Sequence, residues 1–317
     1  MQLPEDWNVH RIPPSETFAI LTYHRIAPYQ HPLTLPVHLE ANIVLPPETF
    51  TMHLSVLKRK ANVISLDLAL QLSKAHGLPE RAVVLTFDDG FREHFDDVAD
   101  RLTMLQMEAT FFITGYGIYP EFGLRWIEWI GAAHRMLPST REISIAGNTF
   151  LIGGKSDISL IRKYFRHLDS IGQRETLSQI SRDLGLPNEE FDLLRDQLFP
   201  SMDKLMQLRG VEYLALGGHS LSHPSLSSLS GESKRDEILG SLEMLQALAP
   251  DSAHSFAYPF GGIESYDAEC RSIIKEAGFR CACTSVPGLN SAETPVFDLK
   301  RFDMNKFDIN EVLEAFP

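Results

Sequence analysis

Residues 82–90, Ala-Val-Val-Leu-Thr-Phe-Asp-Asp-Gly, are the stretch from which the fold class can be predicted. A short, apolar, β-rich run ends abruptly in two carboxylates and a glycine. Similar runs recur along the chain and alternate with longer segments of helical periodicity, which is typical of βα units that build a parallel sheet. The other candidate strands cover residues 19–24, 62–65, 109–114, 213–216, 255–258 and 280–284.

The segments between these runs carry helix signals. Residues 48–60 follow two prolines and carry apolar side chains at i, i+4 and i+7, and proline is tolerated in a first helical turn. Ser265 is expected to cap a second helix that stops at Gly278. Seven strands alternating with helices indicate a small or incomplete barrel, and 317 residues suffice to form such a barrel as one domain.

The alternation breaks over about residues 116–210. This part contains an aromatic helix around Trp126 and Trp129, a hairpin predicted over residues 143–152, and polar helices after it. No linker rich in Pro, Gly or Ser frames it. We therefore expect a mostly helical insertion, packed as a lid or flank on a single domain of residues 1–317, and not a separate domain.

The composition excludes several classes of partner. The chain has 29 Lys and Arg against 42 Asp and Glu, a net charge of −13, and no basic block, so nucleic acid and anionic lipid are not expected partners. Its three cysteines are too few for a disulfide framework, and Cys281 and Cys283 are expected to be reduced core residues. With no signal sequence at Met1 and no run of about 18 apolar residues, we expect a cytoplasmic protein without a transmembrane segment.

The first candidate site motif is the carboxylate pair Asp88 and Asp89. Adjacent strand residues point to opposite faces, so both can serve one site only if the chain turns there, and Gly90 permits that turn. Alternatively, one of the two carboxylates caps the helix that begins near Phe91 and the other is solvated.

The second motif is the pair His219 and His223, which follows a strand and two glycines. Over one helical turn, this spacing would put both imidazoles on one face, where they could bind a metal. No cysteine is near, so two His and one Asp would leave coordination positions open for water and substrate, as in a catalytic metal site. The alternative is a structural role for the histidines.

The third motif covers residues 255–262, an aromatic strand that breaks at Pro259 and continues into two glycines. Such a loop can present backbone N–H groups to a ligand, as an oxyanion hole requires.

Together these motifs resemble those of the polysaccharide deacetylases of carbohydrate esterase family 4, the NodB-homology fold. The resemblance rests on TFDDG at residues 86–90, HSLSHP at 219–224 and FAYPFG at 256–261, the last in the form of the exopolysaccharide branch. The opening LTYHRI at residues 21–26 is also similar to that branch. The resemblance spans about residues 18–302, is poor through the insertion, and implies a deformed, incomplete (β/α)7-type barrel.

The resemblance also implies roles for individual residues. Asp89, His219 and His223 would hold a divalent metal, usually Zn²⁺ in this family, with Co²⁺ or Ni²⁺ as alternatives. Asp88 would be the general base, and the backbone N–H of Phe260 would stabilise the oxyanion.

Two features depart from the family pattern. The arginine that often begins the third motif is replaced by Ala257, and Arg301 is a candidate for supplying the orienting charge instead. No histidine follows His254 to act as the general acid. His24 is the best candidate for that acid. In the exopolysaccharide branch, which this chain resembles, the order of the motifs looks permuted, so that the general acid lies in an N-terminal Tyr-His motif. The alternative for His24 is a structural histidine at a strand end.

These residues predict a metal-dependent hydrolase that removes N-acetyl groups from a sugar, a glycolipid or a polysaccharide precursor. One alternative is hydrolysis of another small C–N amide on the same fold, and another is a non-catalytic sugar-binding relative. Trp126 and Trp129 could stack on sugar rings or pack the insertion against the barrel. The sequence does not predict an oligomeric state.

Overall fold

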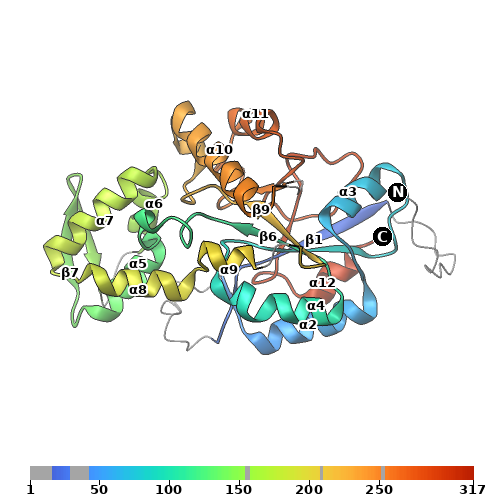
Figure 1. Cartoon of the computed structure of the whole chain (residues 1–317), viewed down its shortest axis with the longest axis horizontal. Helices are drawn as coiled ribbons and strands as arrows, with labels where there is room; N and C mark the ends of the chain where they lie inside the picture. The colour runs from blue at the N-terminus through green and yellow to red at the C-terminus, as the bar shows by residue number, and fades with distance from the viewer. Residues whose placement is uncertain (1–15, 29–42, 154–157, 208–209, 251–253) are drawn as a thin grey trace.

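The strands of the protein form one large, mainly parallel sheet (Figure 1). The computed structural model describes residues 16–28, 43–153, 158–207, 210–250 and 254–317, so the N-terminal segment used above to predict location lies outside the described residues. The sheet has the order β11-β10-β9-β6-β5-β1-β12, with β13 beside β1 and β4 beside β5. Its strands are β1 (Thr17–Tyr23), β4 (Asn62–Val63), β5 (Ala82–Phe87), β6 (Ala109–Ile113), β9 (Leu214–Gly218), β10 (Phe256–Ala257), β11 (Ala282–Cys283), β12 (Asn290–Ser291) and β13 (Phe302–Asp303).

All seven predicted strands are present, and the predicted α/β class is confirmed. Every pairing in this sheet is parallel except that of β1 with β12. Among the described residues β11 does not pair with β12, so the sheet is an incomplete barrel, as expected. Two further short strands, β2 (Arg25–Ile26) and β3 (Val44–Leu45), pair with each other beside the sheet.

Helices cover both faces of this sheet in Figure 1, with α2, α4 and α12 on one face and α3, α10 and α11 on the other. Their bounds are α2 (Pro47–Lys60), α3 (Leu66–Lys74), α4 (Ala99–Leu105), α10 (Gly231–Leu248), α11 (Ala268–Ala277) and α12 (Ile309–Glu314). Three single-turn segments are η1 (His94–Val98), η2 (Pro120–Phe122) and η3 (Leu226–Ser228). No helix in the described part of the chain has the length and hydropathy that a membrane span requires.

One predicted helix cap is wrong. The helix α11 does stop at Gly278, which takes the left-handed conformation, but its N-cap is Asp267. The Asp267 side chain accepts a hydrogen bond from the backbone N of Cys270 at 2.9 Å. Ser265 instead closes the preceding turn, where its hydroxyl donates to the Gly262 carbonyl at 2.6 Å.

Alternate residues of the central strands point into two hydrophobic clusters. On β1, the side chains of Leu21 and Tyr23 belong to one hydrophobic cluster, whereas those of Phe18 and Ile20 belong to a second cluster on the opposite face of the sheet. Cys281 and Cys283 are free thiols, and both are buried in that second cluster. They are core residues, as predicted.

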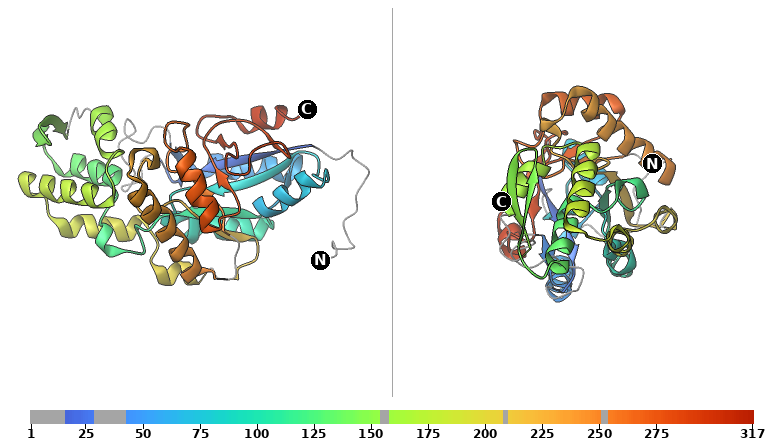
Figure 2. Two further views of the ribbon diagram at one scale, coloured as in Figure 1. Left: turned by 90° about the horizontal axis from the view of Figure 1, so that it is seen from above. Right: turned by 90° about the vertical axis from the view of Figure 1, so that its left-hand side faces the viewer.

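The insertion extends from one end of the sheet, at the left of Figure 1 and of the left view of Figure 2. It contains the predicted hairpin and five helices: β7 (Arg141–Ile145), β8 (Asn148–Ile152), α5 (Trp126–Met136), α6 (Ile158–Phe165), α7 (Ser170–Leu184), α8 (Asn188–Leu198) and α9 (Met202–Met206).

A separate hydrophobic cluster holds the insertion together. Trp126 stacks on Phe165 at 5.6 Å between ring centroids, and Trp129 stacks on Phe191 at 5.0 Å. Both tryptophans therefore pack the insertion, although Trp126 also reaches the cavity described below. The strands on both sides of the insertion share one sheet, and the single-domain organisation stays a prediction.

Candidate active site

The predicted site residues gather where parallel strands end. His24 follows β1, Asp88 and Asp89 follow β5, and His219 follows β9. Because these strands are parallel neighbours, their carboxyl ends meet at one edge of the sheet. All four side chains line a cavity of about 230 Å³, together with His223 and Phe260.

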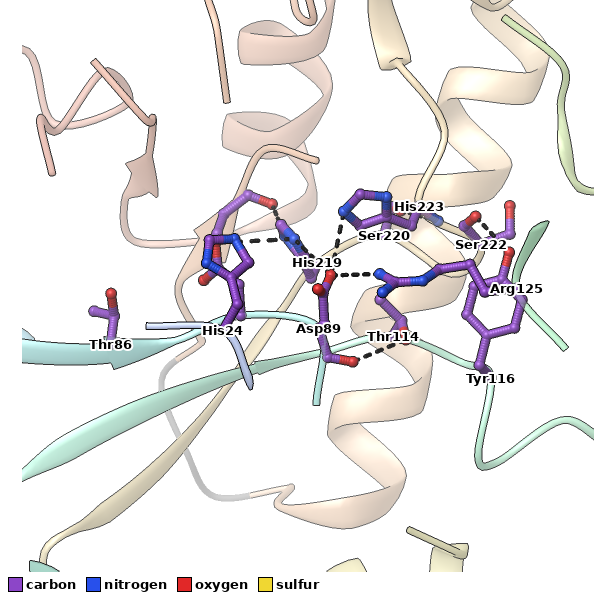
Figure 3. A network of polar contacts seen from close by, with 12 residues as sticks. His24, Thr86, Asp89, Thr114, Tyr116, Arg125, His219, Ser220, Ser222 and His223 are labelled. Atoms are coloured by element: carbon purple, nitrogen blue, oxygen red, sulfur yellow. Dashed lines mark hydrogen bonds and ion pairs between the residues drawn. The ribbon is translucent and has the colours of Figure 1, made fainter. Parts of the chain in front are cut away.

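Asp89, His219 and His223 form a compact set of candidate metal ligands (Figure 3). One ligand atom from each lies within 4.8 Å of the others, and all three side chains are buried. Asp89 Oδ1 is 3.3 Å from His223 Nε2 and 3.7 Å from His219 Nε2. One carboxylate and two imidazoles are suitable ligands for a divalent metal and leave further coordination positions open.

The histidines are in the form that metal binding requires. His219 Nδ1 donates to the Ala257 carbonyl at 2.8 Å, which leaves the lone pair of Nε2 directed at Asp89. Burial lowers the pKa of His219 and lowers the pKa of His223 well below its usual value, against the opposing effect of the nearby carboxylates. Both imidazoles are therefore neutral ligands, so these residues fit a bound divalent metal.

The loop that carries the two histidines is not the expected helical turn. Ser220 and His223 both have a positive φ, of 60° and 56°, and the hydroxyl of Ser220 accepts from the backbone N of His223 at 2.9 Å. The buried carboxylate of Glu237, on α10, accepts from the backbone N of Leu221 at 2.9 Å and from that of Ser222 at 2.8 Å. Glu237, which lies outside the motif, therefore fixes the conformation of the loop. The i, i+4 spacing alone does not explain why the two imidazoles lie together.

The turn predicted at the carboxylate pair is present. Asp89 and Gly90 have φ values of 75° and 70°, and a Cβ on Gly90 would come within 3.1 Å of Ile113. Thr114 Oγ1 donates to the Asp89 carbonyl at 3.2 Å and holds the turn. Both carboxylates face the cavity and neither caps the following helix, so the capping alternative is wrong.

Arg301 lies against Asp88. Its two terminal nitrogens donate to the two oxygens of Asp88, each at 2.7 Å, and its Nε donates to the Thr284 carbonyl at 2.7 Å. Arg301 is fully buried. Burial alone would raise the pKa of Asp88, but Arg301 and the neighbouring His219 outweigh it, so the pKa lies below its usual value. The structure thus brings the predicted orienting charge to the predicted base, from a position 44 residues after Ala257.

His24 and Phe260 also line the cavity. The His24 carbonyl accepts from His94 Nε2, while His24 Nδ1 is buried and has no partner among the described residues. Phe260 has φ 63°, and its ring packs against His223 at 4.8 Å between centroids. No acceptor among the described residues takes the backbone N–H of Phe260.

Two buried residues of the site, Arg125 and Glu128, were not predicted from the sequence. Arg125 Nη1 donates to Asp89 Oδ1 at 2.7 Å, and Arg125 also makes two hydrogen bonds to Glu128, with all three side chains buried. Burial would raise the pKa of Asp89, but Arg125 and the nearby histidines hold it far below its usual value. The one available signal was an Arg and a Glu three residues apart at the start of an aromatic, largely apolar helix.

Further contacts tie the insertion to the histidine loop. Tyr116 Oη donates to the Ser222 carbonyl at 2.9 Å, and the Ser225 backbone N donates to the Arg166 carbonyl at 3.0 Å. The insertion therefore supports both a metal-ligand candidate, through Arg125, and the loop that carries the other two.

Comparisons with known proteins identify the family of this chain. The family model described as polysaccharide deacetylase matches residues 75–122 and 132–282, more than half of the chain, which confirms the resemblance seen in the motifs. No curated protein sequence matches the chain.

Three solved structures illustrate the similarity of fold. Streptococcus pyogenes deacetylase PplD in complex with acetate is 15% identical over 96% of this chain and 99% of that chain, with a TM-score of 0.61. A de-N-acetylase from Aggregatibacter actinomycetemcomitans is 13% identical over 94% and 99%, with a TM-score of 0.59. IcaB from Ammonifex degensii is 13% identical over 95% and 97%, also with a TM-score of 0.59. At these identities the similarity shows the fold alone.

Proposed function

The chain belongs to the polysaccharide deacetylase family, and from this premise we propose that it is a metal-dependent hydrolase that removes N-acetyl groups from a sugar, a glycolipid or a polysaccharide precursor. The observation that carries the proposal is one cavity lined by Asp88 and by the set Asp89, His219 and His223. The deacetylase descriptions of the structural relatives support the same reaction class.

Asp89, His219 and His223 are the residues that would hold the metal. Zn²⁺ is the expected ion, with Co²⁺ or Ni²⁺ as alternatives; when bound, it would polarise the acetyl carbonyl and lower the pKa of a water molecule. The hydrogen bond from His219 to Ala257 fixes the imidazole orientation needed for this role.

Asp88 would accept the proton of the attacking water as that water adds to the amide carbon. The carboxylate stays ionised because Arg301 lowers its pKa, and the two parallel hydrogen bonds from Arg301 fix its orientation. Arg301 would thus orient the general base, which is the role expected of the arginine that Ala257 replaces.

Phe260 and His24 would complete the reaction. The backbone N–H of Phe260 would donate to the developing oxyanion, and a change of side chain from Tyr to Phe leaves that donor in place. His24 would donate a proton to the leaving amine, which departs as the free amine together with acetate.

Acetate release tests the proposal directly. Purified protein should release acetate from an N-acetylhexosamine oligomer, glycolipid or nucleotide sugar in the presence of Zn²⁺, Co²⁺ or Ni²⁺, and chelation should abolish the release. Elemental analysis of the same sample should find about one divalent ion per chain, and none in Asp89→Asn. Release from cyclic amides only would favour the alternative amide hydrolase. A chain without stoichiometric metal and without turnover would be the non-catalytic relative.

The assignment of the general acid has its own test. His24→Ala should lower kcat for acetate release by about 10²- to 10⁴-fold, the usual contribution of a positioned acid or base, while metal content stays unchanged. The loss should shrink for a substrate whose leaving group needs no proton, such as an activated acetyl ester. Near-normal turnover on the amide in metal-loaded His24→Ala would show that His24 is a structural residue.

The expected cytoplasmic location also stays a proposal. Fractionation of the native host, followed by immunodetection of the untagged protein, is the measurement that checks it.

A further inference from the structure

Arg125 and Glu128 form a buried ion pair at the start of α5, and this pair contacts the metal-ligand candidate Asp89. Arg125 Nε donates to Glu128 Oε2 at 2.7 Å, and Nη2 donates to the other oxygen of Glu128. The third nitrogen of the guanidinium, Nη1, donates to Asp89 Oδ1 at 2.7 Å. Each of the three side chains is at most 4% exposed, so bulk water does not compete for these hydrogen bonds.

The surroundings of Arg125 leave its guanidinium little freedom. The guanidinium carbon lies over two aromatic rings, 5.3 Å from the centroid of Phe91 and 5.9 Å from that of Phe199. Arg125 is also the N-cap residue of α5, and its carbonyl accepts from the backbone N of Trp129 at 2.9 Å. Both the backbone and the guanidinium of Arg125 are therefore held in place by the protein itself.

Arg125 holds the oxygen of Asp89 that lies near the imidazoles, as Figure 3 shows. This oxygen, Oδ1, is 3.3 Å from His223 Nε2 and 3.7 Å from His219 Nε2. A carboxylate oxygen has two lone pairs, so one can accept from Arg125 while the other binds a cation beside the imidazoles. The hydrogen bond thus fixes the direction in which Asp89 presents its second lone pair.

Glu128 cancels the charge of Arg125. An arginine beside a metal site would by itself repel a bound cation, because the two charges have the same sign. The paired hydrogen bonds to Glu128 make the ion pair neutral overall. Glu128 lies outside the set of described residues that line the cavity. The pair can therefore orient Asp89 without reducing the negative charge that the site offers to a metal.

Folding alone does not account for this ion pair. A buried ion pair is often no more stabilising than well-packed apolar side chains of similar volume, because desolvation offsets the attraction. A carboxylate that binds a metal, by contrast, is oriented by a hydrogen-bond partner, and loss of such a partner weakens metal binding. A guanidinium that bonds to Glu128 and Asp89 at once supplies such a partner.

We propose that Arg125, held by Glu128, is a positioning residue that fixes the Asp89 carboxylate in the orientation that binds the divalent metal. The inference rests on the proposed function and adds to it a residue that acts on the metal through Asp89. Because Arg125 belongs to the insertion, the insertion completes a metal site whose ligands all lie at the strand ends of the sheet.

The test measures the Kd of the whole protein for Zn²⁺, by competition of metal-free protein against a chromophoric chelator. Arg125→Met/Glu128→Met removes the two charges together, so it leaves the net charge beside the site unchanged and tests orientation alone. Its Kd should rise by about 10- to 100-fold, the usual effect of losing a hydrogen-bond partner of a metal ligand. An unchanged Kd would overturn the proposal.

Phe150→Ala is the matched control for a merely structural role. Phe150 is buried in the hydrophobic cluster of the insertion and packs on Tyr164, but it does not line the cavity. Its truncation should weaken the insertion and leave the Kd for Zn²⁺ unchanged. If Phe150→Ala raised the Kd as much as the double variant does, Arg125 would act only through the stability of the insertion, and the proposal would be wrong.

The absorption spectrum of the Co²⁺-loaded protein gives a second readout, because its ligand-field bands depend on the geometry of the ligands. The bands should shift in the double variant and stay unchanged in Phe150→Ala. Should circular dichroism show that the double variant does not fold, Arg125→Lys replaces it. Lysine keeps the charge, but its ammonium cannot reproduce the planar fork that spans Glu128 and Asp89. A wild-type Kd and spectrum in Arg125→Lys would then overturn the proposal.

Acetate release by the wild type separates failure of this inference from failure of the proposed function. If the wild type releases acetate and the double variant binds Zn²⁺ equally tightly, the deacetylase assignment stands and the positioning role is wrong. If no substrate yields acetate but the Kd rises in the double variant alone, the positioning role stands and the proposed function is wrong. If the wild type binds no metal, both are wrong.

Discussion

Asp88→Asn is expected to lower kcat for acetate release by about 10²- to 10⁴-fold, because an amide cannot accept the proton of the attacking water. The substitution keeps the size of the side chain and one oxygen that can still accept from Arg301. Asp88 lies outside the metal-ligand set, so the metal content of the variant should equal that of the wild type. Acetate release and elemental analysis on one sample measure both quantities.

Arg301→Gln is the companion variant for Asp88→Asn. It removes the cation that orients Asp88 and keeps its carboxyl ionised, so kcat should fall and the acidic limb of the pH–rate profile should move to higher pH. Asp88→Asn should show a residual rate without that limb. If Asp88→Asn retains normal turnover, or loses its metal together with its activity, Asp88 is not the general base.

Arg125→Met is expected to lower the free energy of unfolding by about 3–5 kcal/mol, because it leaves the buried carboxylates of Asp89 and Glu128 without their cation. Denaturant unfolding of metal-free protein followed by circular dichroism measures the change. Arg101→Met is the matched control. Arg101 pairs with Asp97 on the surface, where both side chains are at least 33% exposed, and its loss should cost about 1 kcal/mol or less.

The effect of Arg125→Met should depend on pH. In the wild type the pKa of Asp89 lies below its unfolded value of 3.8, so Asp89 stabilises the fold above that pH and loses the contribution as pH falls further. Without Arg125, burial raises the pKa of Asp89, and ionisation then opposes folding as pH rises. The difference between variant and wild type should therefore be largest near neutral pH and shrink in acid. A loss no greater than that of Arg101→Met would contradict the role assigned to Arg125.

Local patterns were sufficient to predict the central strands and the three motifs. The strands β5 and β6 are continuous apolar runs bounded by turn residues, and such runs can be recognised without knowing the fold. The strands β12 and β13 were missed because their residues, Asn290–Ser291 and Phe302–Asp303, do not form an apolar run, and each strand forms by pairing with β1. The cap of α11 was misplaced by two residues because two side chains near its start could both cap it.

The residues that complete the site depend on contacts distant in the sequence. Asp88 and Arg301 are separated by 213 positions, and Asp89 and Arg125 by 36. Periodicity and spacing carry no information about such pairs. The proximity of His219 and His223 was predicted correctly, but for the wrong reason, because Glu237 on a distant helix shapes the loop. Arg301 could be suggested only because the family resemblance raised the question of a missing charge.

Four residues of the site, Asp89, Ser220, His223 and Phe260, share the left-handed backbone conformation. In this region a side chain with a Cβ costs about 1–2 kcal/mol, a penalty that glycine does not incur. Side-chain contacts offset this penalty: Asp89 pairs with Arg125, the Ser220 hydroxyl accepts from the backbone N of His223, and the Phe260 ring packs on His223. A variant that loses one of these contacts keeps the backbone penalty without its compensation. The loops of this cavity should therefore be the first part of the protein to loosen, while the buried sheet beneath them stays intact.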